Sequence, residues 1–169
     1  AGIPGSSSGK LRGRKFDEWD GGVRVPAVFY WKKAENNYEN LSSQVTGFVD
    51  IVPTLKELVG DKSRPKRAYD GISILPLLTG STDCIDRNFY LGCGAVVNKD
   101  YKLIRKGRKP GLNLPQDFLV DYQTDPYEKK NACDGNEQIV KALFQIAVKY
   151  DTITPCLLYT SDAADEARS

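Results

Sequence analysis

Histidine and methionine are both absent from this chain of 169 residues. Without histidine, the chain cannot supply a Ser-His-Asp triad, the paired histidines of a zincin or a histidine general base. Long hydrophobic runs are missing as well: no stretch approaches the roughly 20 apolar residues that span a bilayer, and no signal peptide opens the sequence. These absences exclude histidine-based catalysis by this chain alone and predict no membrane span.

An excess of charge of either sign is also missing. Lysine and arginine number 24 against 22 aspartate and glutamate residues, so the formal net charge is +2. This excess is too small to indicate nucleic acid as a partner. Hydrophobic residues make up 40% of the chain and charged residues 27%, which is typical of a globular domain. We expect a soluble piece of a larger protein that binds no nucleic acid.

Four cysteines stand at positions 84, 93, 133 and 156. No two of them form a C-x-x-C pair, and without histidine a zinc site would need all four from scattered loops. We therefore expect no metal site within the chain. Cys84 and Cys93 flank a predicted strand, so a disulfide between them would require a bend, and the connectivity stays open.

Apolar spacing predicts three helices, over residues 50–60, 71–80 and 137–150. Asp50 is suited to cap the first helix and Gly60 to end it. Asp125 and Glu128 form a capping box around Pro126, which predicts a further helix start.

Branched and aromatic residues predict four strands, over residues 23–31, 88–91, 101–105 and 117–122. The short turns between the last three strands indicate an antiparallel sheet. The last helix has an apolar face that holds Ile139, Leu143 and Ile146, and we expect this face to cover the sheet.

The last part of the chain, residues 156–169, differs from what precedes it. It follows Pro155, lacks apolar periodicity and ends in a short acidic, alanine-rich run. The string resembles the translated read-through of a sequencing adapter, and such a segment is left out of fold reasoning. We expect a non-native tail that packs against nothing; an ordinary frayed C-terminus is the alternative.

Positive charge is concentrated in two segments, Lys10–Lys15 and Lys102–Lys109. The second ends at a Pro-Gly turn and predicts a solvated hairpin rather than a binding patch. The first precedes Gly21 and Gly22, which allow close approach of the backbone. The apolar residues expected to bury one side of this turn are Phe16, Trp19 and Val23. A basic side chain on such a rigid, glycine-rich segment suits an anionic ligand.

Several motifs occur in a fixed order from residue 11 to about residue 150. They are Leu11–Lys15, Trp19–Pro26, Asp50–Leu55, Asp70–Ser73 with Leu75–Gly80, Tyr101–Ile104, and Asp125–Glu128 with Asn131. Together they resemble formylglycine-dependent sulfatases, and arylsulfatases of the N-acetylgalactosamine-4-sulfatase type have the nearest pattern. One departure is Asp20, where the family usually has glutamate, so the bond that this carboxylate makes must be shorter.

The resemblance implies an alkaline-phosphatase-like α/β sulfatase fold, present here in truncated form. Residues 1–83 would form the end of the large α/β domain. Residues 84–155 would form a small C-terminal subdomain of antiparallel sheet and helix, and residues 156–169 the tail.

The resemblance also implies a sulfuric ester hydrolase. In this family a formylglycine hydrate attacks the sulfur, while calcium and basic residues hold the sulfate oxygens. Lys15 matches the family's sulfate-binding lysine and is the candidate catalytic and substrate-binding residue. Arg24 is expected to tie its turn to a carboxylate.

The nucleophile and the calcium ligands are expected upstream of residue 1, so no metal ligand is assigned here. Cys84 is followed by Ile-Asp-Arg and not by the x-Pro-x-Arg of the modified cysteine. We therefore expect a C-terminal fragment that alone hydrolyses no sulfate ester.

A sulfated small molecule or glycan is the implied partner, and the family is usually secreted, lysosomal or periplasmic. Two other functions stay open. One is a phosphodiesterase or phosphonate hydrolase of the same superfamily, which the Leu11–Lys15 motif disfavours. The other is a non-catalytic module that binds sulfated glycans or nucleic acid through the basic segments 62–67 and 102–109.

Overall fold

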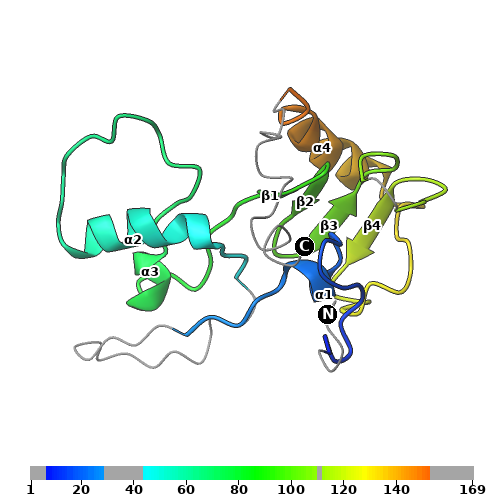
Figure 1. Ribbon diagram of the computed structural model, residues 1–169, viewed down its shortest axis with the longest axis horizontal. Coiled ribbons are helices and arrows are strands. Elements are labelled where there is room, and N and C mark those ends of the chain that lie inside the picture. The colour runs from blue at the N-terminus through cyan, green and yellow to red at the C-terminus, as the bar shows by residue number, and fades with distance from the viewer. Residues whose placement is uncertain (1–6, 29–43, 110–111, 153–169) are drawn as a thin grey trace, which may run out of the picture.

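The computed structural model of the chain describes residues 7–28, 44–109 and 112–152 (Figure 1). In chain order the elements are α1 (Asp20–Val23), the 3-10 turn η2 (Phe48–Asp50), α2 (Ile51–Leu58), α3 (Leu75–Leu78), β1 (Phe89–Gly92), β2 (Ala95–Val97), β3 (Tyr101–Ile104), β4 (Phe118–Asp121) and α4 (Glu137–Val148). Within these ranges, no helix combines the length and the apolar character needed to cross a membrane. The predicted tail, 156–169, lies outside the described residues.

The four strands form one antiparallel sheet in the order β1-β2-β3-β4. Each strand pairs with the next along the chain, so that Lys102 of β3 lies between Val97 of β2 and Val120 of β4. The antiparallel sheet expected from the sequence is confirmed. The sequence analysis missed β2, because its three residues follow directly on a turn in which Cys93 and Gly94 have φ of 44° and 78°.

Side chains alternate along the strands, and one face of the sheet is covered by α4 (Figure 1). The core on this face consists of Val96, Leu103, Leu119, Leu143 and Ala147, none more than 3% exposed. Ile139 and Ile146 of α4 are partly buried against the same core. The expected cover of the sheet by the last helix is therefore confirmed.

The opposite face of the sheet is covered by the N-terminal segment. Its core consists of Trp19, Ala95, Ile104 and Val120. The Trp19 ring meets the Phe118 ring edge-on, with the centroids 5.0 Å apart. Of the three apolar residues expected to bury this turn, Trp19 is in the core, whereas Phe16 is 74% exposed. One tryptophan therefore fastens the segment that carries Lys15 to the sheet.

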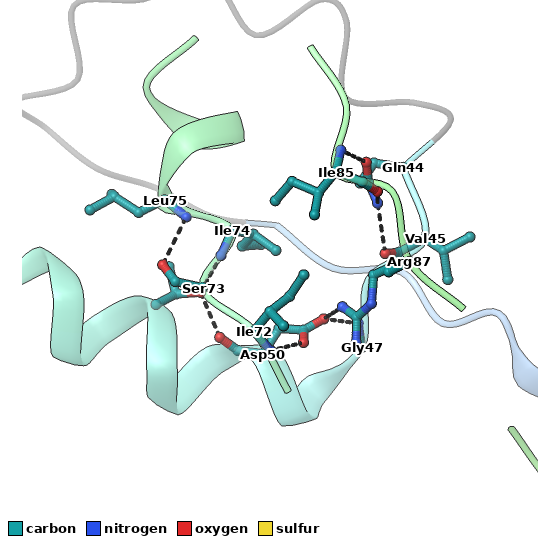
Figure 2. A network of polar contacts seen from close by, with 11 residues as sticks. Gln44, Val45, Gly47, Asp50, Ile72, Ser73, Ile74, Leu75, Ile85 and Arg87 are labelled. Carbon is teal, nitrogen blue, oxygen red and sulfur yellow. Dashed lines mark hydrogen bonds and ion pairs between the residues drawn. The ribbon is translucent and has the colours of Figure 1, made fainter. Parts of the chain in front are cut away.

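The helices α2 and α3 lie to one side of the sheet (Figure 1), and Asp50 links them to the chain that enters β1. Its buried carboxylate accepts hydrogen bonds from the backbone N–H groups of Gly47 and Ile72, at 2.8 and 2.9 Å. It also pairs with Arg87 at 2.7 Å (Figure 2). The Asp50 side chain thus joins three segments instead of capping α2, for which it makes no capping hydrogen bond.

The apolar face of α2 is exposed to solvent in this chain. Ile51, Leu55 and Leu58 are 40%, 53% and 38% exposed. The buried residue of the helix is Thr54, whose hydroxyl donates to the Asp50 carbonyl and accepts from the N–H of Ile74. A hydroxyl that satisfies two backbone groups thus links α2 to Ile74, the buried residue just before α3.

Two predicted elements are wrong. Residues 24–28 form no strand, since Val23 ends α1 and Pro26 follows; residues 29–31 lie outside the described ranges. Residues 125–128 form a turn and not a helix start. The capping-box pattern failed because Glu128, with φ of 58°, accepts the N–H of Asp20 from across the fold.

Leu143→Ala is expected to lower the free energy of unfolding by about 2–5 kcal/mol, because it opens a cavity between α4 and the sheet. Gln145→Ala, at an exposed position of the same helix, is the matched control and should change it by less than about 0.5 kcal/mol. Urea unfolding followed by circular dichroism measures both. If Leu143→Ala is as stable as the control, α4 does not pack as described.

Candidate functional site

Lys15 stands at the exposed tip of a tight loop. Arg14 and Asp17 close this loop: the N–H of Arg14 donates to the Asp17 carboxylate, and the N–H of Asp17 donates to the Arg14 carbonyl, both at 2.9 Å. The Lys15 ammonium lies 4.8 Å from the centroid of the Phe16 ring. Among the described residues no carboxylate pairs with Lys15, so its charge faces solvent.

Two glycines let the two stems of the loop, residues 12–14 (the first stem) and 17–22 (the second stem), come together. The N–H of Gly21 donates to the Arg12 carbonyl at 2.7 Å. A Cβ at Gly21 would lie 2.6 Å from that oxygen, and one at Gly22 would lie 2.2 Å from the Asp17 carbonyl. Both distances are too short for any side chain, so the close backbone approach expected of this pair is confirmed.

Arg12 fixes the first stem of the loop. Its guanidinium lies 3.6 Å from the centroid of the Trp19 ring and 5.0 Å from that of Phe118. It also donates a hydrogen bond to the backbone carbonyl of Glu128. Burial lowers the pKa of Arg12, while the charges of Glu128 and Asp125 oppose the shift. This side chain is therefore committed to holding the loop.

Beneath the loop, Asp20, Lys102 and Glu128 form what we call the buried charge cluster. Lys102 is fully buried, and its ammonium donates to Asp20 at 2.5 Å, to Glu128 at 2.6 Å and to the Glu18 carbonyl at 3.1 Å. The second Glu128 oxygen accepts the N–H of Asp20 at 2.8 Å. An ammonium has three N–H donors, and here each one has an acceptor.

Tyr122 and Arg24 complete the environment of Asp20. The Tyr122 hydroxyl donates to one Asp20 oxygen at 2.9 Å, and Arg24 Nε lies 2.9 Å from the other. Arg24 thus ties its turn to a carboxylate, as the sequence predicted. Burial, followed by the negative charges of Asp20 and Glu128, raises the pKa of Tyr122 far above its ordinary value. Burial also raises the pKa of Glu128, against the opposing charge of Lys102.

Lys102 and Glu128 are the residues that the sequence analysis missed. The prediction of a solvated hairpin for 102–109 is wrong at its start, since Lys102 is 0% and Arg105 9% exposed. The run of lysine and arginine concealed this burial. Strand alternation could have revealed it, because Lys102 and buried Ile104 share one face of β3.

No group of three or more acidic or cysteine residues in the described ranges could hold a metal ion. Asp17 and Asp20 are each committed to hydrogen bonds within the loop and the cluster. The described cysteines, Cys84, Cys93 and Cys133, are free thiols. The acids described here therefore do not fit calcium, and none of these three cysteines is followed by the x-Pro-x-Arg of the modified cysteine.

The site offers an exposed cation, the Lys15 ammonium, on a loop that hydrogen bonds hold in place. Lys15 is exposed, as are Lys10 and Arg14, whereas Arg12 and Arg24 are paired within the fold. An ammonium in this position can donate hydrogen bonds to the oxygens of an anion and compensate its charge.

Comparison of the sequence finds sulfatases. The chain is 33% identical to human steryl-sulfatase over 97 residues, which is 57% of this chain and 16% of that protein. It is 35% identical to human arylsulfatase D over 69 residues, 41% of this chain and 12% of that protein. Identity to the ulvan-active sulfatase of Formosa agariphila is 28%, covering 77% of this chain and 34% of that protein. No family model matches the chain.

Comparison of the structure finds the same fold. A chain labelled "6S-sulf", from glycosaminoglycan metabolism by Bacteroides thetaiotaomicron, aligns with a TM-score of 0.52 at 21% identity, over 62% of this chain and 24% of that one. The expected resemblance to sulfatases and the expected fold class are thus confirmed. The chain spans well under half the length of these relatives. The boundaries at residues 83 and 155 and the narrower N-acetylgalactosamine-4-sulfatase type stay predictions.

The raised pKa of Tyr122 predicts a loss of stability in alkali. Above pH 10, near the ordinary tyrosine pKa, Tyr122 of the unfolded chain releases its proton, whereas folded Tyr122 keeps it. The contribution of Tyr122 to the free energy of unfolding is therefore complete below pH 10 and declines above it. Tyr122→Phe should remove about 1.4 kcal/mol per pH unit from the slope of unfolding free energy between pH 10 and 11.5. Urea unfolding measures the slope, with Tyr69→Phe, at an exposed tyrosine, as control. Equal slopes in wild type and Tyr122→Phe would contradict the burial of this hydroxyl.

Proposed function

We propose that this chain, a relative of the sulfatases, is part of a sulfuric ester hydrolase in which Lys15 binds the sulfate group. The supporting observation is that Lys15 is an exposed cation on a loop whose stems are held by glycine contacts and by the buried charge cluster. The substrate is a sulfate ester of a small molecule or of a glycan, as the substrate names of the relatives suggest.

The chemistry of sulfate transfer suits such a residue. Negative charge develops on the sulfuryl oxygens and on the leaving oxygen as the ester bond breaks. A fixed ammonium donates hydrogen bonds to these oxygens and stabilises the charge more than it stabilises the ground state. Rigidity matters because the loop does not have to reorganise at the moment of reaction.

Calcium and formylglycine belong to the proposal for the whole enzyme and not to the described residues. In the whole enzyme, calcium would compensate sulfate charge and a formylglycine would supply the nucleophile. The described acids and cysteines do not fit either role. The role assigned to this chain is therefore limited to holding and orienting the sulfate through Lys15.

The other two functions receive less support. The relatives found are named sulfatases, which favours sulfate over a phosphate or phosphonate ester. A non-catalytic module that binds glycan or nucleic acid needs accessible cations in the segments 62–67 and 102–109; residues 62–67 are exposed, whereas 102–109 is exposed only in part. Burial of Lys102, and the pairing of Arg105 and Arg108 with Asp151, remove much of the charge of 102–109 from a ligand's reach.

Lys15→Ala, made in a full-length sulfatase that carries this segment, is expected to lower kcat about 10²–10³-fold, because one charge-stabilising contact is lost. Lys10→Ala, which removes an exposed cation from the same segment, is the matched control and should leave turnover unchanged. The assay uses an aryl sulfate, with circular dichroism to verify the fold. Wild-type turnover in the folded Lys15→Ala enzyme would contradict the proposal.

A further inference from the structure

We infer that Lys102 is a positioning residue that acts through Asp20 and Glu128 to hold the loop carrying Lys15. This inference rests on the proposed function, since it names the residue that makes the sulfate-binding loop rigid. Lys102 lies in β3, 87 positions along the chain from Lys15, and has no access to solvent. It therefore touches no substrate and can affect the reaction only through the loop.

Both stems of the Lys15 loop are hydrogen-bonded either to Lys102 or to Glu128, its ion-pair partner. On the second stem, the Glu18 carbonyl and the Asp20 carboxylate accept from the Lys102 ammonium. On the first stem, Arg12 donates to the backbone carbonyl of Glu128, whose carboxylate accepts from Lys102. The hydrogen bond from Gly21 to Arg12 then joins the two stems. Hydrogen bonds therefore connect Lys102 to both stems of the loop.

Charge explains why this position needs a lysine. Asp20 and Glu128 would repel one another in a buried site without a cation between them. Lys102 lies within 2.6 Å of both carboxylates, whereas Arg24 reaches Asp20 alone and its side chain is 60% exposed. A buried pair that loses one partner leaves an uncompensated charge, which favours separation of the loop from the sheet.

The first test is hydrogen–deuterium exchange on the 169-residue chain, read by mass spectrometry on peptides that cover residues 12–22. Lys102→Met should raise exchange of these peptides about ten-fold or more, while peptides from α4 stay protected. Lys99→Met, at an exposed position just before β3, removes the same charge and should change neither. Unchanged exchange of residues 12–22 in folded Lys102→Met would overturn the inference.

A second variant covers the case in which Lys102→Met does not fold. Lys102→Met combined with Glu128→Gln removes one carboxylate charge together with the ammonium, so fewer unpaired charges are left buried. The expected result is a folded chain with a rapidly exchanging loop. A folded double variant whose residues 12–22 stay as protected as in wild type would show that the ammonium does not position the loop.

The enzyme assay separates this inference from the proposed function. In a full-length sulfatase, Lys102→Met should lower kcat about ten- to hundred-fold with the fold intact, in the same direction as Lys15→Ala. If Lys15→Ala has no effect but Lys102→Met frees the loop in exchange, the function of Lys15 is wrong and the positioning role stands. If Lys15→Ala is inactive and Lys102→Met turns over normally, the positioning role is wrong.

Discussion

One buried ammonium, that of Lys102, holds the N-terminal segment on the sheet. It lies between the carboxylates of Asp20 and Glu128 and also binds the Glu18 carbonyl. Removing a lysine from water is costly, and the cost is offset only when every donor finds an acceptor. That condition is met here by acceptors from two distant parts of the chain, residues 18–20 and Glu128. The segment that carries Lys15 and the turn at Glu128 both contact this ammonium, and Trp19 packs on the same face of the sheet.

The buried charge cluster and Asp50 each link distant segments, in different parts of the molecule. Each uses a buried carboxylate to join segments that are far apart in sequence, and each carboxylate binds both a cation and a backbone N–H. Apolar packing contributes at α4, where a conventional helix covers the sheet. Between the helices and the sheet, polar links replace a shared core, and the apolar face of α2 remains exposed. The Lys15 loop is therefore held by its contacts with the sheet, through Lys102 of β3.

The sequence predicted what local rules determine. The antiparallel strands, the apolar face of α4 and the glycine pair at 21 and 22 were all predicted, because alternation, helical spacing and backbone sterics are readable over short windows. Lys102 and Glu128 were not, because their partner Asp20 lies 82 and 108 positions away. The sequence signals that did exist, a lysine run and a capping box, predicted exposure and a helix. The role of Lys15 came from resemblance to a family, since its exposed side chain has no local pattern of its own.

Lys102 acts on the reaction through Lys15, and a double-mutant cycle in a full-length sulfatase that carries this segment measures this coupling. The quantity is kcat/KM for an aryl sulfate in wild type, Lys15→Ala, Lys102→Met and the double variant. Lys102→Met should lower kcat/KM when Lys15 is present and should have little further effect once Lys15 is alanine, so that the two losses are strongly non-additive. Fully additive losses in folded proteins would contradict it, because they would mean that the two lysines act independently.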